Sequence, residues 1–196
     1  MAEVQGDVSG PAVAALLARM DPRWPEQARA VTASAQGRDP LPFYPNGWLW
    51  QLSTGEAGGG RGLRVVENTA GLMLLDGSRA AIEEANRTLR LRLDATNVGD
   101  YVCFFFGNVG DGKLLPFAST AAALAALAPD PALQARAPSL LDPVVPPTLV
   151  STTPDAWTLR FAGLWETLVI GMEVRVGHDG VIEPLRRASL ATLAAA

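Results

Sequence analysis

Histidine and cysteine are almost absent from this sequence, which has one of each, His178 and Cys103, among 196 residues. These two side chains supply most general bases that work near neutral pH, most thiolate nucleophiles and the preferred ligands of zinc. Their scarcity argues against a zinc site, thiol catalysis and a classical serine triad. A lone cysteine cannot form an internal disulfide, so we expect a cytoplasmic chain with no metal and no other cofactor.

Positive charge is also scarce, because sixteen Lys and Arg stand against twenty Asp and Glu and give a net charge of -4. The isoelectric point is about 5.0. Binding to a phosphate backbone requires clustered basic residues. The densest basic group, Arg87, Arg90 and Arg92, alternates with leucines, as on the solvated face of a strand. We therefore expect no nucleic-acid partner.

Long apolar runs are missing, since no run approaches the roughly 18 residues that a membrane-spanning helix needs. The residues after Met1 lack the basic and apolar regions of a signal peptide. We expect no membrane association. A hydrophobic content of 48% and a charged content of 18% predict a globular chain with one core. The expected organisation is a disordered segment at 1–10 and a single domain at 11–196.

The N-terminal part contains a stripe of apolar residues at helical spacing, after a Ser9 cap and Pro11. Such a stripe needs a partner, and the mean hydropathy of +0.16 is high for a monomer. We therefore expect self-association or binding of another protein through this stripe: Val13, Leu16, Leu17 and Met20. A second helix is expected at about 25–35, followed by a proline-rich loop at 40–45.

Short strands are predicted next. Alternation after the Asn46-Gly47 turn predicts a strand at 48–52, and two more are expected at 63–67 and 72–75. Ser78 precedes good helix formers and predicts a helix at 79–89. The apolar segment 97–109 fits either a buried helix or a central strand, and the spacing slightly favours the helix.

The C-terminal half begins with an Ala-rich helix at 119–128 and a proline-rich stretch at 129–154 that predicts no long regular element. Three alternating segments then predict an antiparallel meander: 157–164, 168–176 and 181–187. Its last turn, His178-Asp179-Gly180, would place Arg175 opposite Glu183. The predicted fold is α+β, with short antiparallel strands and a C-terminal meander packed against two or three helices in a single domain.

The segment from Gly107 to Lys113 matches the GxxxxGK core of a phosphate-binding P-loop. Leu114 replaces the Ser or Thr whose hydroxyl would hold magnesium, and Pro116 interrupts the helix that should follow. A turn between a helix and a strand therefore explains the segment better than nucleotide binding does.

Carboxylates remain as candidate acids and bases. Glu67 and Asp76 follow short apolar strands, and Asp100 precedes Tyr101. Two converging carboxylates can transfer protons when one is desolvated. The alternative for each is a cap, turn or surface residue. His178 is expected to be a polar turn residue, and Cys103 a buried neutral thiol.

Aromatic residues are concentrated between positions 24 and 50. Tyr44, Trp48 and Trp50 could line a pocket for a small apolar ligand or a partner peptide, together with Trp24 and Phe43. Ordinary core packing is the alternative, and it is the more common role for such residues.

The stretch from Leu74 to Phe117 resembles a group of bacterial proteins to which no function is attached. The resemblance covers about a quarter of the chain and depends on short motifs: Leu75-Asp76-Gly77-Ser78, Asp100-Tyr101, Phe104-Phe105, and Gly112 followed by Pro116-Phe117. It implies one packed unit and no activity.

Two functional hypotheses follow. The first is a cytoplasmic, metal-free binding or protein-interaction module that self-associates. The alternative is an enzyme that uses carboxylate acid-base chemistry on a small molecule in an aromatic pocket. The sequence leaves open whether the chain is an enzyme.

Overall fold

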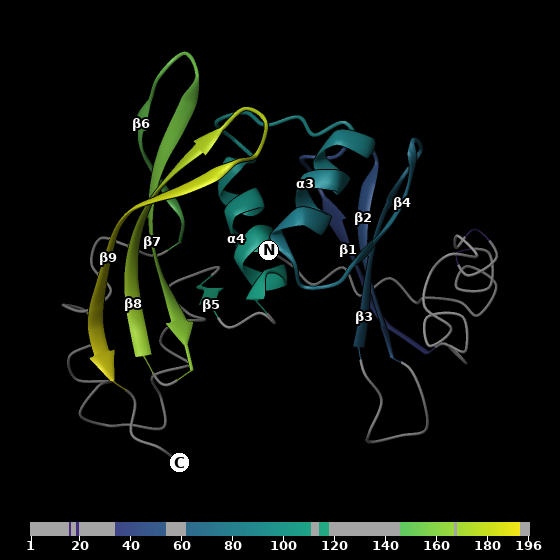
Figure 1. Cartoon of the computed structure of the whole chain (residues 1–196), viewed down its shortest axis with the longest axis horizontal. Helices are drawn as coiled ribbons and strands as arrows, with labels where there is room; N and C mark the ends of the chain where they lie inside the picture. The colour runs from purple at the N-terminus through teal and green to yellow at the C-terminus, as the bar shows by residue number, and fades with distance from the viewer. Residues whose placement is uncertain are drawn as a thin grey trace. The chain divides into compact units, whose positions relative to one another are not determined.

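The computed structural model describes Leu16, Arg19 and residues 34–53, 62–110, 114–117, 146–166 and 168–192. The chain divides into two compact units, Met1–Leu91 and Arg92–Ala196, and each contains an antiparallel sheet and a helix (Figure 1). This confirms the α+β fold class. No helix in the described ranges is long and apolar enough to cross a membrane.

Several expectations fall outside these residues. They are the disordered segment 1–10, most of the helices expected at 11–20 and 25–35, and the Ala-rich helix at 119–128. The single domain at 11–196 stays a prediction.

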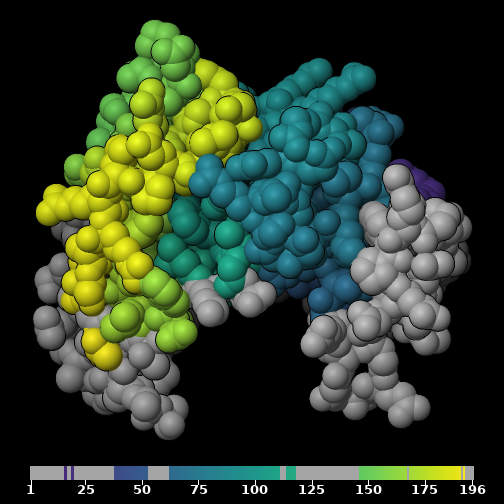
Figure 2. Space-filling model, viewed as in Figure 1, coloured from purple at the N-terminus to yellow at the C-terminus, as the bar shows by residue number. Residues whose placement is uncertain are grey.

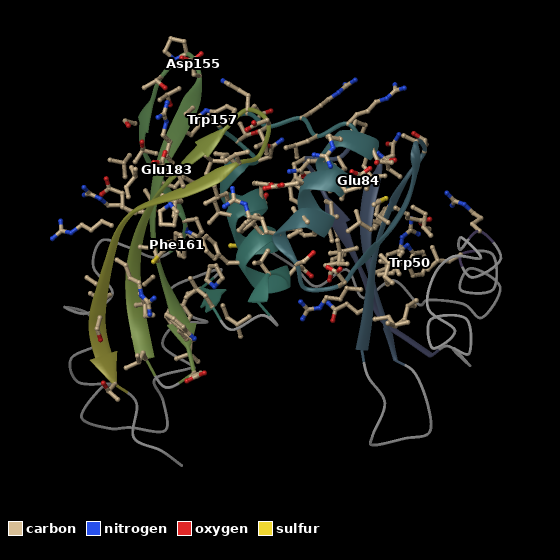
Figure 3. The ribbon with its side chains drawn as sticks, viewed as in Figure 1. Trp50, Glu84, Asp155, Trp157, Phe161 and Glu183 are labelled. Atoms are coloured by element: carbon tan, nitrogen blue, oxygen red, sulfur yellow. The ribbon has the colours of Figure 1, made fainter. Side chains whose placement is uncertain are left out.

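Four strands form the sheet of the first unit, in the order β1-β2-β3-β4. The elements are β1 Ser34–Leu41, β2 Gly47–Ser53, β3 Gly62–Asn68, β4 Gly71–Leu75 and the helix α3 Arg79–Thr88. The predicted strands at 48–52, 63–67 and 72–75 are confirmed. Trp48 lies opposite Glu67, and Trp50 lies opposite Val65. Because side chains alternate between faces, both tryptophans share one face, and Figure 3 shows Trp50 pointing away from α3.

Strand β1 lies where the sequence predicts a helix up to about residue 35 and a loop from residue 40, and both predictions are wrong for the residues of this strand. The strand instead runs from Ser34 to Leu41 and includes Pro40. Proline is tolerated there because β1 is an edge strand, where a missing N–H breaks no ladder. The turn expected before Trp48 is confirmed, with Asn46 at a φ of 53°.

The helix α3 begins where the sequence predicts. The Ser78 hydroxyl accepts a hydrogen bond from the Ala81 N–H at 3.1 Å, which satisfies one of the free amides of the first turn. Loss of such a cap typically costs about 1 kcal/mol. The cap therefore fixes where β4 ends and the helix starts.

One buried side chain, Asn68, joins the β3–β4 turn to the end of α3. Its Oδ1 accepts hydrogen bonds from the N–H groups of Ala70 at 2.8 Å and Gly71 at 3.2 Å. Its Nδ2 donates to the Leu89 carbonyl at 2.8 Å. The turn and the helix are thus positioned by the same residue.

In the second unit, the segment 97–109 is the helix α4 Val98–Asn108, so the preferred alternative is confirmed. The helix packs on the second sheet, where the Phe106 and Phe161 rings lie 5.3 Å apart. The Tyr101 hydroxyl donates to the Gly180 carbonyl at 2.8 Å. These contacts attach α4 to both a strand and a turn of that sheet.

The second sheet contains the predicted C-terminal meander. Its strands are β5 Leu114–Pro116, β6 Thr148–Thr152, β7 Ala156–Trp165, β8 Leu168–Gly177 and β9 Ile182–Thr192. The order is β5-β7-β8-β9, and β6 also pairs with β7. The predicted pairing of Arg175 with Glu183 is confirmed, and Gly180 has a φ of 79° in the last turn. Residues 183–189 of the edge strand β9 are all exposed (yellow in Figure 2).

The P-loop resemblance is not matched by the element order. A P-loop connects a strand to a helix, whereas here α4 precedes the segment and β5 follows it. Residues 111–113 lie outside the described residues. The predicted alternative, a connection between a helix and a strand, is confirmed.

Candidate functional site

The candidate site lies on the face of the first sheet that points away from α3. Side chains at alternate positions of β2 and at the facing positions of β3 share this face. We call it the tryptophan face and define it by six residues: Trp48, Trp50, Leu52, Leu63, Val65 and Glu67. It combines apolar surface with one carboxylate.

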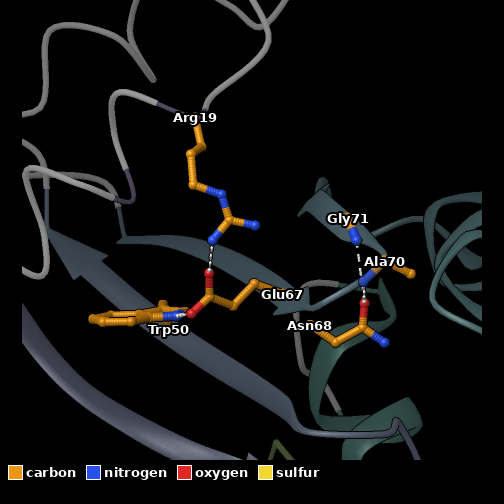
Figure 4. A network of polar contacts seen from close by, with 6 residues as sticks. All are labelled: Arg19, Trp50, Glu67, Asn68, Ala70 and Gly71. Atoms are coloured by element: carbon orange, nitrogen blue, oxygen red, sulfur yellow. Dashed lines mark hydrogen bonds and ion pairs between the residues drawn. The ribbon is translucent and has the colours of Figure 1, made fainter.

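Glu67 has two partners on this face (Figure 4). Its Oε1 accepts a hydrogen bond from the Trp50 indole N–H at 2.9 Å, and its Oε2 accepts one from Arg19 at 2.9 Å. The Glu67 side chain is only 12% exposed, while that of Arg19 is 52% exposed. A buried indole N–H usually has an acceptor, and here that bond also orients the carboxylate toward the cation.

Leu16 brings an apolar side chain to the same face. It is 2% exposed and packs in a cluster with Trp50, Leu52 and Val65. The Arg19 N–H donates to the Leu16 carbonyl at 3.0 Å, so the two residues are one turn apart. Leucine burial of this kind contributes about 2 kcal/mol. One short segment thus places both a leucine and an arginine on the tryptophan face.

The structure therefore places Leu16 in a cluster within its own chain. The helical spacing predicts Leu16 at an interface with a partner, together with three other residues. Those three, Val13, Leu17 and Met20, lie outside the described residues.

Arg38 contributes a second cation. Its guanidinium carbon lies 3.7 Å from the ring centroid of Trp48 and 5.0 Å from that of Trp50. Cation–π pairs occur about once per 70–80 residues, so one pair does not mark a site. Two indoles share this guanidinium, however, and its Nε is buried with no hydrogen-bond partner among the described residues. Two aromatic rings of this face therefore share one cation.

Tyr44 packs against α3 rather than beside Trp48 and Trp50, as the alternative of ordinary core packing predicts, and the pocket at the tryptophans stays a prediction. Tyr44 is 1% exposed, and its hydroxyl donates to Asn86 Oδ1 of α3 at 2.6 Å. Its ring packs edge-on against Phe43 with centroids 5.0 Å apart. Tyr44 thus belongs to the packing of α3, while Trp24 lies outside the described residues.

The described contacts do not unite the three candidate carboxylates. Asp76 binds the Ser78 side chain and backbone N–H, and these hydrogen bonds lower its pKa. Glu67 is occupied by Trp50 and Arg19. Asp100 lies in the second unit, where partial burial raises its pKa. Asp76 therefore acts as part of the turn before α3, and no shared proton site is formed by Glu67 and Asp76.

His178 is a polar turn residue as expected, whereas Cys103 is partly rather than fully buried. The exposed His178 lies in the β8–β9 turn, with its ring centroid 4.2 Å from that of Trp157 and its Nε2 2.9 Å from the Pro154 carbonyl. Since a carbonyl only accepts, the Nε2–H donates. Burial, with the Asp100 charge, raises the pKa of the Cys103 thiol to about 11, so the thiol is neutral and unreactive at pH 7.

The open hollow around His178 has a volume of about 460 Å³. It is lined by Asp155, Ala156, Arg175, Gly177, His178, Asp179, Val181 and Glu183. Across the described ranges, no three His, Cys, Asp or Glu residues are grouped closely enough to hold a metal ion. The hollow therefore offers mixed charges but no ligand set for a metal.

Sequence reasoning missed the two arginines of the site. Arg19 follows Leu16 by three residues, which places both on one side of a helical turn, and this spacing could have identified it. Arg38 could not be identified, because β1 itself was not predicted. The resemblance of residues 74–117 to a bacterial group stays a prediction. Comparisons of the chain with protein-family models, curated proteins and solved structures found no match.

Proposed function

We propose that this chain is a cytoplasmic, metal-free protein-interaction module. Its tryptophan face binds a segment that carries a leucine and an arginine one helical turn apart. The observation that carries this proposal is the placement of Leu16 and Arg19, which already occupy the face in the way such a segment would. The lone neutral cysteine supports the cytoplasmic assignment.

The chemistry of the face supports recognition of this pattern. The apolar cluster around Trp50 excludes water from the leucine, and Glu67 supplies a carboxylate that the indole holds in place. A partly buried acceptor of this kind favours a guanidinium, which can donate in a fixed direction. Leucine burial supplies affinity, and the charge pair supplies specificity and orientation.

The described contacts of Glu67 and Asp76 do not favour carboxylate catalysis by this pair. Both oxygens of Glu67 accept hydrogen bonds, and the hydrogen bonds that lower the Asp76 pKa keep that group ionised. An acid-base pair needs one group that retains its proton near neutral pH. We therefore propose binding rather than catalysis.

A peptide titration tests the proposal. The probe is a fluorescent peptide of residues 9–22. It is titrated with a full-length receiver chain that carries Leu16→Asp and Arg19→Glu. These two substitutions weaken the binding of that chain's own segment to its tryptophan face. We expect saturable binding in fluorescence anisotropy. The affinity should fall about tenfold when the peptide carries Arg19→Glu. Absence of saturable binding to a receiver whose circular dichroism matches the unmodified chain would overturn the proposal.

A further inference from the structure

The hollow around His178 carries charged groups of both signs, and its volume of about 460 Å³ is in the range of small-ligand pockets. We infer that this hollow binds a tripeptide with free ends, whose carboxylate contacts Arg175 and whose amine contacts Asp155. All the lining residues belong to the second unit. The inference therefore does not depend on the tryptophan face.

Small residues of two neighbouring strands leave space in the hollow. Ala156 of β7 lies directly opposite Gly177 of β8, and neither has a side chain beyond Cβ. Because side chains alternate between faces, Arg175 shares the face of Gly177. A Cβ on Gly177 would lie 2.7 Å from Asp179 Oδ1, so only glycine fits there. The space above these two residues is open and is bordered by charged side chains.

Hydrogen-bond acceptors lie at the end of the hollow formed by the β6–β7 loop and the β8–β9 turn. Asp155 lies in that loop (Figure 3), and its side chain has no hydrogen bond or ion pair with any described residue. Asp179 Oδ1 accepts a hydrogen bond from the Val181 N–H at 3.0 Å, which holds a second carboxylate at this end. Since His178 Nε2–H donates to the Pro154 carbonyl, its Nδ1 is an acceptor. An ammonium group, which only donates, fits this end.

Arg175 supplies the donors for the other end of the ligand. Its side chain is exposed and forms no hydrogen bond or ion pair within the described part of the chain. Glu183 is its cross-strand partner, but no ion pair joins their charges. The guanidinium therefore keeps its donors for a carboxylate, which it can bind through two parallel hydrogen bonds.

The spacing of these groups selects the length of the ligand. Thr158 is the strand partner of Arg175, and Asp155 lies three positions before Thr158. Three positions at about 3.3 Å each separate the two charges by about 10 Å along the strand. The amine and carboxylate of a free amino acid share one carbon atom and cannot bridge this distance. An extended tripeptide spans about 10 Å and places one charged end near each group.

Isothermal titration calorimetry of the full-length chain with Ala-Ala-Ala tests the inference. We expect saturable binding at one site. Acetylation of the amine or amidation of the carboxylate should each lower the affinity about tenfold, and free alanine should bind at least about tenfold more weakly. Absence of saturable binding up to about 10 mM tripeptide would overturn the inference. Equal affinities for the free and the capped tripeptides would also overturn it.

Substitutions in the hollow assign the two ends of the ligand. Arg175→Gln should lower the affinity for Ala-Ala-Ala about tenfold and leave the affinity for the amidated tripeptide unchanged. Asp155→Asn should do the same for the free and the acetylated tripeptides. The matched control is Arg186→Gln, because Arg186 is exposed on β9 and does not line the hollow. Equal losses for Arg175→Gln and Arg186→Gln, in chains with unchanged circular dichroism, would overturn the assignment of the carboxylate to Arg175.

Discussion

Replacing Glu67 by alanine and by glutamine separates its two interactions. Glu67→Ala removes the acceptor of the Trp50 indole and the partner of Arg19. Glu67→Gln keeps one carbonyl oxygen for the indole but replaces the other oxygen with an NH2 donor, so it removes both the charge and the acceptor of Arg19. The two variants should therefore differ by the contribution of the indole hydrogen bond.

The magnitudes follow from burial. Trp50 is 3% exposed, so an indole N–H left without an acceptor costs about 1 to 3 kcal/mol. Arg19 is 52% exposed, so the charge pair contributes about 0 to 1 kcal/mol. We expect Glu67→Ala to lower the free energy of unfolding of the first unit by about 2 kcal/mol. Glu67→Gln should lower it by less than about 1 kcal/mol.

Urea unfolding followed by tryptophan fluorescence measures both free energies. Hydrogen exchange of the Trp50 indole N–H, observed by NMR, reports the bond directly. The indole should stay protected in Glu67→Gln and exchange rapidly in Glu67→Ala. Equal destabilisation by the two substitutions, with equal indole protection, would refute the reasoning.

Three further predictions concern other residues. Arg38→Ala should change the free energy of unfolding in urea by less than about 1 kcal/mol, because the lost cation–π contact and the removed unpaired Nε offset each other; a loss twice as large would contradict this balance. Asn68→Ala should cost about 2 kcal/mol in the same assay, since two amides and the Leu89 carbonyl lose their partner. An unchanged urea midpoint would show that these bonds contribute little. The Cys103 thiol, with a pKa raised from 9.0 to about 11, should react with a disulfide reagent at pH 8 about a hundredfold more slowly than in the unfolded chain. The raised pKa of Cys103 makes its full contribution to the free energy of unfolding below pH 9, where the thiol of the unfolded chain also keeps its proton. This contribution is lost as the pH rises toward 11. Equal rates in the folded and unfolded chains would contradict the burial of this thiol.

Local patterns were sufficient to predict much of the fold. The alternation of Trp48, Trp50 and Leu52 identifies β2, and the Ser78 cap identifies the start of α3. The β8–β9 turn fixed the register that pairs Arg175 with Glu183. Each of these features depends on residues that are close in sequence, so periodicity and capping rules identify them.

Long-range pairing explains what the sequence analysis missed. Arg19 and Glu67 are 48 positions apart, and no local pattern links them. The separation of Tyr44 from the tryptophans depends on Asn86 of α3, 42 positions away. The strand β1 was not predicted, because Pro40 usually indicates a loop. An edge strand nevertheless tolerates proline. In each case, contacts between residues that are distant in the sequence determine the structure.

The central claim is that the tryptophan face binds the Leu16–Arg19 pattern through Glu67. The most direct test measures peptides of residues 9–22 against a full-length Leu16→Asp receiver with Glu67 or with Glu67→Arg. The account predicts that the Arg19 peptide prefers the Glu67 receiver and that a peptide with Arg19→Glu prefers the Glu67→Arg receiver. Equal affinities for all four combinations would contradict the claim.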